Sequence, residues 1–335
     1  MKRFALFANF ENPMGDTRRA LLESVRTVCH AEALGYEEVW LTEHHFNPFS
    51  VSAALFSLLS YLAARTRSIG LGAGALLLPF HEPFRVAEEI ATLDALSGGR
   101  LLLGIGRGGP FPEQFRHFGV SHDESRARMF EGMAVLEKLL GGAQVWHQGT
   151  FHHYEDLSVY PRPMRPGPPP IWLASMSDAG VELAARRGYG LMAPSAAPTS
   201  RIAAVMERWR ALGGNPERPL VLARYLSCHE DGRRAREDAT PFIRDFGSNM
   251  RAAICRIPSA APVQPFSQPE SAFAEAQILA NAIVGDPAAC VEQCLALKEV
   301  VGDCVLLLKP ASYDPEINRR SLTLFAEQVR PRLTS

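Results

Sequence analysis

The sequence predicts a protein of the α/β class that folds as a (β/α)8 TIM barrel. Short apolar runs alternate along the chain with longer segments of helical periodicity, which is typical of parallel strands separated by helices. The strand-like runs are almost continuously apolar, which indicates strands buried on both faces. Eight such runs fit one barrel, and 335 residues lie within the range of a single barrel. We therefore expect residues 1–335 to form one domain.

The expected elements follow one another in order. The strands are residues 4–8, 38–42, 69–78, 100–106, 171–174, 191–193, 220–227 and 305–308. The helices that pack around them are residues 18–34, 51–65, 84–96, 125–140, 178–187, 200–212 and 317–329. Several of these helices end at glycine (Gly35, Gly98 and Gly141), the residue that most readily takes the left-handed conformation of a helix end.

Two segments interrupt this alternation. Residues 144–157 predict a hairpin that turns at Gln148-Gly149, and the proline-rich residues 161–170 follow it. The strand and helix pattern resumes afterwards, so we interpret this stretch as an excursion from the barrel. After the seventh strand, residues 247–285 have a weaker pattern, and four prolines fall within residues 257–269. This insertion is lid-like, and composition alone allows either a lid or a floppy loop.

Composition excludes several classes of protein. The chain is 47% hydrophobic and 21% charged with a net charge of −1, which gives no electrostatic basis for binding nucleic acid or an anionic membrane. It carries no apolar stretch of membrane-spanning length and no signal peptide pattern, so a cytoplasmic protein is expected. The six cysteines form no CxxC pair, and we expect Cys290 and Cys294 to pack inward from one helix face.

Polar residues cluster where the predicted strands end, at the face of a barrel that carries active sites. Glu43, His44 and His45 follow the second strand, and imidazole is the side chain suited to proton transfer near neutrality. Neither HxH nor HExxH spacing completes a metal site around them, so no metal is expected. Other polar residues at strand ends, to which no role is assigned, are Asn9, Glu11 and Lys309. The pair His152-His153, within the hairpin, is expected at the surface.

Two further strand ends predict a phosphate site. Arg107 lies in a glycine-rich run, residues 104–109, that fails as a dinucleotide fingerprint because Pro110 and Pro112 stand where a helix should begin. Ser175, Ser177 and Asp178 precede or begin a helix, and the free N–H groups of a helix start attract anions. Ser177 could equally be a plain N-cap. Arg107 and this helix start could grip one phosphate between them.

The sequence resembles the bacterial luciferase-like flavin monooxygenases, nearly from end to end. The segments that carry the resemblance are VWLTEHHF at residues 39–46, GAGALLLP at 72–79, LDALSGGR at 93–100, GIGRG at 104–108 and the closing run from residue 285. The resemblance implies a barrel that binds FMN, largely as FMNH2, at its C-terminal mouth. It places His44 near the flavin C4a and Glu43 in the pocket wall. It gives the phosphate to Arg107 and Ser175, and implies a cis peptide between Gly74 and Ala75 beside the isoalloxazine.

The chain departs from luciferase at two of these positions. Gly106 stands where luciferase has a reactive cysteine, which leaves room for a bulkier substrate or another flavin pose. Asp178 stands where luciferase has a threonine. A carboxylate there suits the helix dipole and repels a phosphate, so Ser177 could take the threonine's role. Both changes leave the fold intact and leave light emission an open question.

The resemblance also implies a mechanism and partners. A separate reductase would supply FMNH2, which reacts with O2 to a C4a-peroxyflavin that oxygenates a small aldehyde or ketone, while His44 deprotonates or orients the peroxide. A homodimer through the early helices is expected. Two alternatives stay open, which are a deazaflavin (F420)-dependent hydride-transfer oxidoreductase and a non-catalytic flavin-binding subunit.

Overall fold

Eight parallel strands close into a barrel in the part of the chain that the structure, a computed structural model, describes, namely residues 3–109, 111–142, 144–164, 167–254 and 273–334. The strands are β1 Arg3–Ala8, β2 Glu38–Leu41, β3 Gly70–Leu77, β4 Leu101–Gly106, β7 Ile171–Leu173, β8 Gly190–Ala193, β9 Leu220–Cys228 and β11 Cys304–Pro310. Their order round the barrel is β11-β1-β2-β3-β4-β7-β8-β9, and β9 pairs with both β8 and β11. The predicted (β/α)8 barrel is confirmed.

Two tryptophans fill the interior of the barrel. The rings of Trp40 and Trp172 meet edge to face, with centroids 5.4 Å apart. A Cβ at Gly72 would lie 2.3 Å from the Trp40 ring, and one at Gly190 would lie 2.2 Å from the Trp172 ring. These glycines are required because each indole occupies the space that a side chain would need. Smaller inward-facing residues complete this core: Ala5, Val221, Ala223, Val305 and Leu307.

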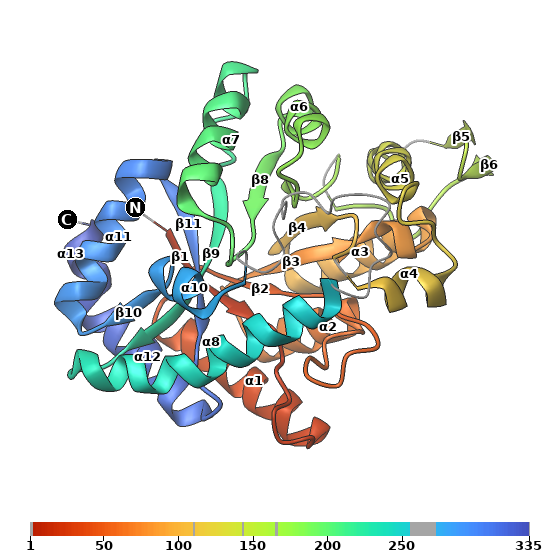
Figure 1. Cartoon of the computed structure of the whole chain (residues 1–335). Coiled ribbons are helices and arrows are strands. Elements are labelled where there is room, and N and C mark those ends of the chain that lie inside the picture. Colours follow the sequence, from red (N-terminus) through yellow and green to blue (C-terminus); the bar gives the residue numbers. More distant parts are fainter. Residues whose placement is uncertain (1–2, 110, 143, 165–166, 255–272, 335) are drawn as a thin grey trace.

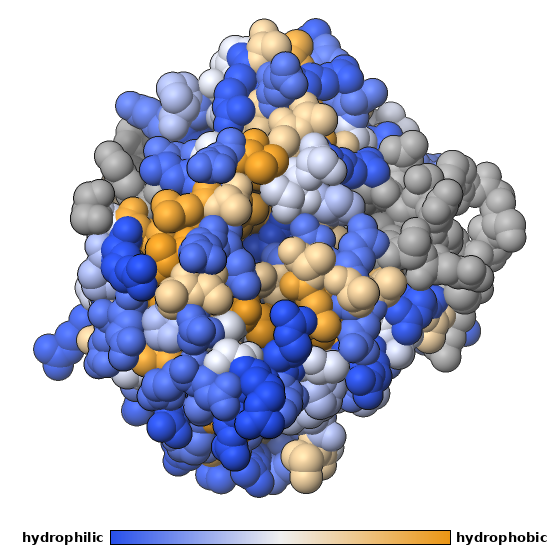
Figure 2. Space-filling view, turned by 60° about the vertical axis from the view of Figure 1, so that its left-hand side comes forward, coloured by the Kyte–Doolittle hydropathy of each residue, from blue (hydrophilic) through white to orange (hydrophobic). Residues whose placement is uncertain are grey.

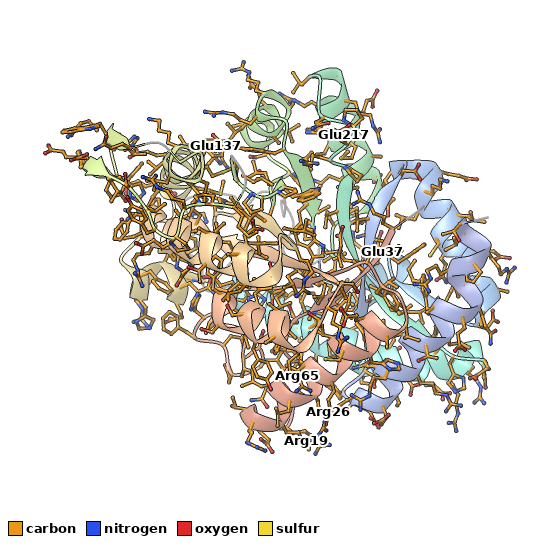
Figure 3. The ribbon with its side chains drawn as sticks, turned by 180° about the vertical axis from the view of Figure 1, so that it is seen from behind. Arg19, Arg26, Glu37, Arg65, Glu137 and Glu217 are labelled. Atoms are coloured by element: carbon orange, nitrogen blue, oxygen red, sulfur yellow. The ribbon has the colours of Figure 1, made fainter. Side chains whose placement is uncertain are left out.

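Helices surround the strands (Figure 1). They are α1 Thr17–Ala33, α2 Leu55–Arg65, α3 Pro83–Ser97, α5 Ser125–Leu140, α6 Asp178–Arg187, α7 Thr199–Ala211, α8 Gly232–Ile254, α11 Pro287–Val301 and α12 Pro315–Leu324. Charged side chains such as Arg19, Arg26 and Arg65 lie on the outer sides of α1 and α2 (Figure 3). The face shown in Figure 2 is mostly hydrophilic, with hydrophobic residues in limited groups. Across the described residues, we find no helix with the length and apolarity needed to cross a membrane.

The predicted hairpin leaves the barrel beside α5. Its strands, β5 Val145–Gln148 and β6 His153–Leu157, pair antiparallel. The expectation that both histidines lie at the surface is wrong for His152, which is only 3% exposed. Its ring stacks on Tyr154, whose hydroxyl donates to Glu82 at 2.8 Å. The hairpin folds back on the residue that precedes α3, and this contact buries the imidazole.

Several elements differ from the predicted ones. A helix, α4 Pro112–Phe118, begins at the proline that was taken to exclude one, because the first helical position needs no N–H. The final helix, α12, continues through a π-helical turn, η2 Phe325–Val329, into α13 Arg330–Thr334.

The insertion after β9 is partly described. Its described flanks are the end of α8, a short helix α10 Glu275–Ala280, and β10 Ile283–Gly285, which pairs with β9 outside the closed barrel. The proline-rich centre, on which the lid prediction depends, lies outside the described residues. Cys290 and Cys294 are both buried on α11, as predicted.

Candidate functional site

A cavity of about 350 Å³ opens at the C-terminal mouth of the barrel, where the strands end. This volume lies within the range of small-molecule sites. Eight of the nine predicted site residues line it: Glu43, His44, Gly74, Ala75, Gly106, Arg107, Ser175 and Ser177. We call this cavity the mouth pocket. The ninth residue, Asp178, does not line it.

The floor of the mouth pocket is apolar and closely packed. The peptide bond between Gly74 and Ala75 is cis, as the resemblance implied. A Cβ at Gly106 would lie 3.3 Å from the Ala75 Cβ and 3.6 Å from that of Ala174. The residue that replaces luciferase's cysteine is therefore part of a smooth floor, on which a larger side chain would stand up into the pocket.

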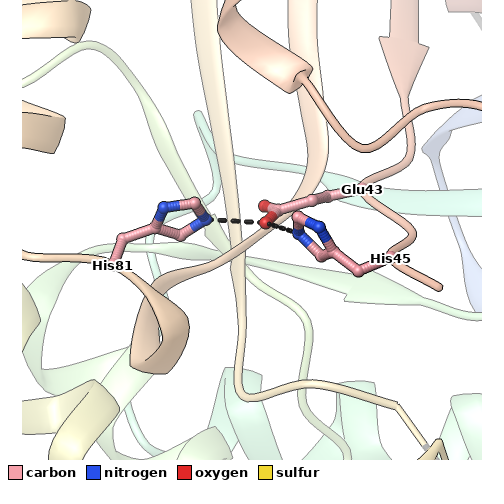
Figure 4. A group of neighbouring side chains, drawn as sticks. All are labelled: Glu43, His45 and His81. Atoms are coloured by element: carbon pink, nitrogen blue, oxygen red, sulfur yellow. Dashed lines mark hydrogen bonds and ion pairs between the residues drawn. The ribbon is translucent and has the colours of Figure 1, made fainter. Parts of the chain in front are cut away.

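Beside the pocket, Glu43 accepts hydrogen bonds from two imidazoles (Figure 4). The Nε2 atoms of His45 and His81 lie 2.7 and 2.6 Å from its Oε1, and the backbone N–H of Leu77 donates to its Oε2 at 2.8 Å. Burial opposes the ionisation of Glu43, but these donors outweigh it and lower the pKa of the carboxyl to about 2. The same contact raises the pKa of His81 against the effect of its own burial.

His81 was missed by the sequence reasoning. It follows η1 Leu78–Phe80, the 3-10 turn after β3, and stands 38 residues after Glu43. No local motif links the two positions. Among the described residues, Glu43, His45 and His81 form the group with metal-ligand chemistry, their ligand atoms lying within 4.8 Å of one another. The distances are those of hydrogen bonds, and both carboxylate oxygens already have partners.

His44 points into the pocket instead of joining this network. Its ring meets Phe111 edge to face, with centroids 5.8 Å apart. Burial, and then the positive charge of Lys309, lower the pKa of His44 to about 4, although Glu43 opposes the shift. The imidazole is therefore neutral near pH 7, and its unprotonated ring nitrogen can accept a hydrogen bond.

The opposite wall of the pocket carries the guanidinium groups of Arg107 and Arg126. Burial lowers the pKa of Arg107, and the nearby Arg126 lowers it further. Neither guanidinium forms an ion pair with a carboxylate among the described residues. Arg126 and Arg201 both line the pocket from the first turn of a helix, α5 and α7, where the helix dipole disfavours a cation. Basic residues in first turns were a signal that the sequence analysis overlooked.

The start of α6 completes this wall. Ser177 is the N-cap, accepting from the Gly180 N–H at 3.4 Å, and its Oγ lies 3.1 Å from that of Ser175. A Cβ at Gly180 would lie 2.2 Å from the Ser175 Oγ, so a side chain there would displace this hydroxyl from the helix start. Asp178 turns outward: its side chain is 80% exposed and pairs with Arg208. Its carboxylate therefore does not face the pocket as the threonine comparison suggested.

Two buried amides line the pocket without satisfying all of their polar atoms. Among the described residues, neither the Oδ1 of Asn9 nor the Oε1 of Gln114 has a hydrogen-bond partner. A buried acceptor without a donor is costly, so these atoms indicate a ligand or solvent that completes them. Asn9 stood in the sequence at a strand end, while Gln114 lies on the helix that was not predicted.

The fold and the pocket define a class: a (β/α)8 barrel that can hold an anionic ligand at its mouth beside a neutral histidine. The model of the family described as luciferase-like monooxygenase matches residues 1–304. The chain belongs to this family, which confirms the predicted membership and the prediction of an enzyme.

Two of the relatives below match nearly the whole chain, and a third matches about three fifths of it. A 4-hydroxyprotoasukamycin monooxygenase from Streptomyces nodosus is 28% identical over 98% of this chain and 91% of its own length. The limonene 1,2-monooxygenase of Rhodococcus erythropolis is 29% identical over 62% of this chain and 53% of its own. The crystal structure of the monooxygenase RslO1 from Streptomyces bottropensis superimposes with a TM-score of 0.81 at 29% identity, covering 99% of both chains.

Proposed function

We propose that this protein is a monooxygenase that uses reduced FMN and O2 to oxygenate a small ring-bearing or carbonyl substrate. The observation that carries the proposal is the arrangement of the mouth pocket, in which Arg107 and Arg126 face a neutral, buried His44 across an apolar floor. Such a pocket fits a ligand with an anionic tail and a planar head.

FMN has this shape and charge. Arg107, Arg126 and the start of α6 with Ser175 and Ser177 would hold the phosphate, because guanidinium groups and free helix N–H groups both bind phosphate oxygens. The floor at Gly74, Ala75 and Gly106 would lie against the isoalloxazine. The unpaired amide oxygen of Gln114 could accept from a ring or ribityl donor.

When bound, the reduced flavin would supply the electrons that activate O2. The residues of this chain then position the reactants and manage protons. His44, neutral at physiological pH, would accept a proton from the reacting oxygen or orient it. Glu43 would hold the neighbouring His45 and His81 in place, and the apolar floor and Phe111 would limit the access of water.

The proposal includes a separate reductase as the source of FMNH2. In its support, a trigonelline monooxygenase of Acinetobacter baylyi named as an oxygenase component is 30% identical over 56% of this chain and 52% of its own length. A solved neighbour, a diketocamphane monooxygenase constituent in complex with FMN, shares the fold with a TM-score of 0.81. A homodimer through the early helices stays a prediction.

Anaerobic titration of reduced FMN tests the cofactor assignment. Arg107→Ala is expected to weaken binding at least about tenfold, because a charge-assisted hydrogen bond in a partly buried site is lost. Arg208→Ala is the matched control, since Arg208 pairs with the exposed Asp178 and does not line the pocket. Equal losses in both variants would contradict the assignment.

The alternative cofactor can be tested in the same titration. A 5,10-methylenetetrahydromethanopterin reductase of Archaeoglobus fulgidus is 30% identical over 50% of this chain and 48% of its own length, so the F420 alternative is retained. Tighter binding of reduced F420 than of reduced FMN, with hydride transfer that needs no O2, would replace the proposed function. Binding of FMN with no reaction in the presence of O2 and substrate would favour a non-catalytic subunit.

A further inference from the structure

Lys309 places a buried ammonium group in the mouth pocket, opposite the cationic wall. It continues the inward-facing series of Val305 and Leu307 on β11. In the closed order of eight strands, β11 lies four places from β4 in either direction, and Arg107 directly follows β4. The two cations therefore stand on opposite sides of the mouth. His44 follows β2, which lies two places from β11 and two places from β4, and Lys309 is close enough to lower the pKa of His44.

The ammonium of Lys309 forms an ion pair with a residue outside the mouth pocket, Glu11. Its Nζ lies 3.2 Å from the Oε1 of Glu11, which lines a neighbouring cavity and not the mouth pocket. Three aromatic rings surround it, with centroids 5.0 Å away for Phe246, 5.1 Å for Tyr225 and 5.7 Å for Phe242, distances at which a ring stabilises a cation. Glu11 is its one polar contact among the described residues, and an ammonium has three donors.

Burying this charge has a cost that an apolar residue would avoid. An ion pair taken out of water often contributes no more stability than a well-packed apolar pair of the same volume. Residues that face inward lower on β11, Val305 and Leu307, are apolar. The lysine therefore stands where the barrel core gives way to the pocket, and its remaining donors are available to a ligand there.

A second unsatisfied group stands on the adjacent strand. Asn9 follows the inward-facing Phe7 at the end of β1, the strand that pairs with β11, and it lines the same pocket. Its Oδ1 is buried without a donor among the described residues. A hydroxyl is the group that matches both, because its oxygen can accept from Lys309 while its O–H donates to Asn9. Phe246, on the wall of the pocket, suits a flat ring.

We propose that Lys309 and Asn9 bind the hydroxyl of a phenol, or of the enol form of a ring ketone, and so select aromatic or conjugated ring substrates with an acidic oxygen. This inference rests on the proposed function for the reaction that follows binding. On ionisation of the bound substrate, the O–H bond breaks, its electron pair stays on the oxygen beside Lys309, and the proton is released to water. Lys309 is a positioning residue, which holds the oxygen of the substrate.

The test compares two probes that differ only in the acidic hydroxyl. Binding of 2-naphthol and of 2-methoxynaphthalene is measured on the whole protein without flavin, so a failure of the cofactor assignment does not affect the result. Lys309→Met is expected to weaken 2-naphthol at least about tenfold, the loss of one charge-assisted hydrogen bond, and to change the methyl ether less than about twofold. Lys309→Arg, which keeps the charge, is expected to retain the preference for 2-naphthol.

The absorption spectrum of the bound probe distinguishes binding of the substrate oxygen by Lys309 from a purely structural role of this residue. The naphtholate absorption band is expected at lower pH for the probe bound to the wild-type protein than for the free probe, and this shift is expected to disappear in Lys309→Met. Equal weakening of both probes, no binding of 2-naphthol to the wild-type protein, or an unshifted band would overturn the proposal. A loss of reduced-FMN binding in Lys309→Met would also overturn it, because the ammonium would then face the cofactor. If Lys309→Met fails to fold, Lys309→Arg with an unshifted band decides against it.

Discussion

Glu38 and Glu43 are buried glutamates at opposite ends of the barrel. Glu38 begins β2, Glu43 follows it, and their pKa values are shifted in opposite directions. Burial raises the pKa of Glu38, although the indole N–H of Trp40, 2.7 Å away, and the half-exposed Arg3 oppose the shift. At the mouth, Glu43 is at least as buried, yet its pKa falls to about 2 because two imidazoles and a backbone N–H donate to it.

This difference between Glu38 and Glu43 shows that the charged buried groups lie at the mouth of the barrel. At the opposite end of the barrel, the carboxyl of Glu38 has hydrogen bonds from the buried Trp40 and from the half-exposed Arg3. At the mouth, an ionised carboxylate orders two histidines, while Arg107, Arg126 and Lys309 bring positive charge that the described protein groups only partly balance. A binding site at the mouth requires polar groups there that the protein does not fully pair, and this is the end where they lie.

The largest expected effect is on catalysis. His44→Ala should lower product formed per O2 consumed by about a hundredfold, because it removes the group that accepts or orients a proton, and should leave binding of reduced FMN within about threefold. The measurement is product against O2 uptake, with reductase and FMN in excess. Arg3→Ala, at the closed end, is the control and should change the ratio less than about twofold. Unchanged coupling in His44→Ala would remove its assigned role.

The stability of the two ends can be compared directly. Glu43→Gln should lower the free energy of unfolding by about 3 kcal/mol, because one uncharged amide replaces the acceptor of a buried charged network. Glu38→Gln should cost less than about 1 kcal/mol. Urea unfolding at pH 7 measures both. A larger loss for Glu38→Gln would reverse the comparison.

The pH dependence should differ in sign. The pKa of Glu43 is lower in the folded than in the unfolded chain, so its contribution to stability is complete above about pH 4.5 and is lost as the pH falls toward 2. The pKa of Glu38 is raised, so its contribution is present at low pH and is lost as the pH rises through that raised pKa. The difference in the free energy of unfolding between the wild type and Glu43→Gln, measured from pH 7 down to pH 3, should therefore be constant down to about pH 4.5 and should narrow below it.

The smallest expected effect is that of Gly180→Ala, which adds one methyl group, on the binding of reduced FMN. Gly180→Ala should weaken reduced FMN by about fivefold, because the new Cβ displaces the Ser175 hydroxyl from the helix start, even though alanine favours helices over glycine. Gly132→Ala is the matched control on α5, where a Cβ meets only ordinary contacts at 3.4 Å. Unimpaired binding in Gly180→Ala would argue against a phosphate at Ser175.

Much of the barrel could be predicted because its strands are short, apolar and separated by amphipathic helices. The α6 helix was predicted at its observed bounds, since Ser177 caps it and Gly188 ends it. The α4 helix was missed because proline was taken as a helix breaker at the one position where it starts a helix. The strand β10 was missed because three residues carry no periodicity.

The site was predictable where its residues stand at strand ends, as His44, Arg107 and Ser175 do. His81 and Arg126 could not be found in that way, because they reach the mouth from a 3-10 turn and from the start of a helix. Lys309 was visible at a strand end, but its aromatic surroundings come from β9 and α8, more than fifty positions earlier in the chain. Residues so far apart in the sequence come together only in the folded protein, so no local pattern reveals their contact.

We propose that the mouth pocket holds reduced FMN and controls its reaction with O2. The most direct test mixes protein-bound reduced FMN with O2 in a stopped-flow instrument and follows the return of oxidised-FMN absorbance. We expect this return to be at least about tenfold slower than for free reduced FMN, because the bound flavin is shielded from water, and we expect Arg107→Ala to lose most of the delay. An identical rate with and without the wild-type protein would contradict it.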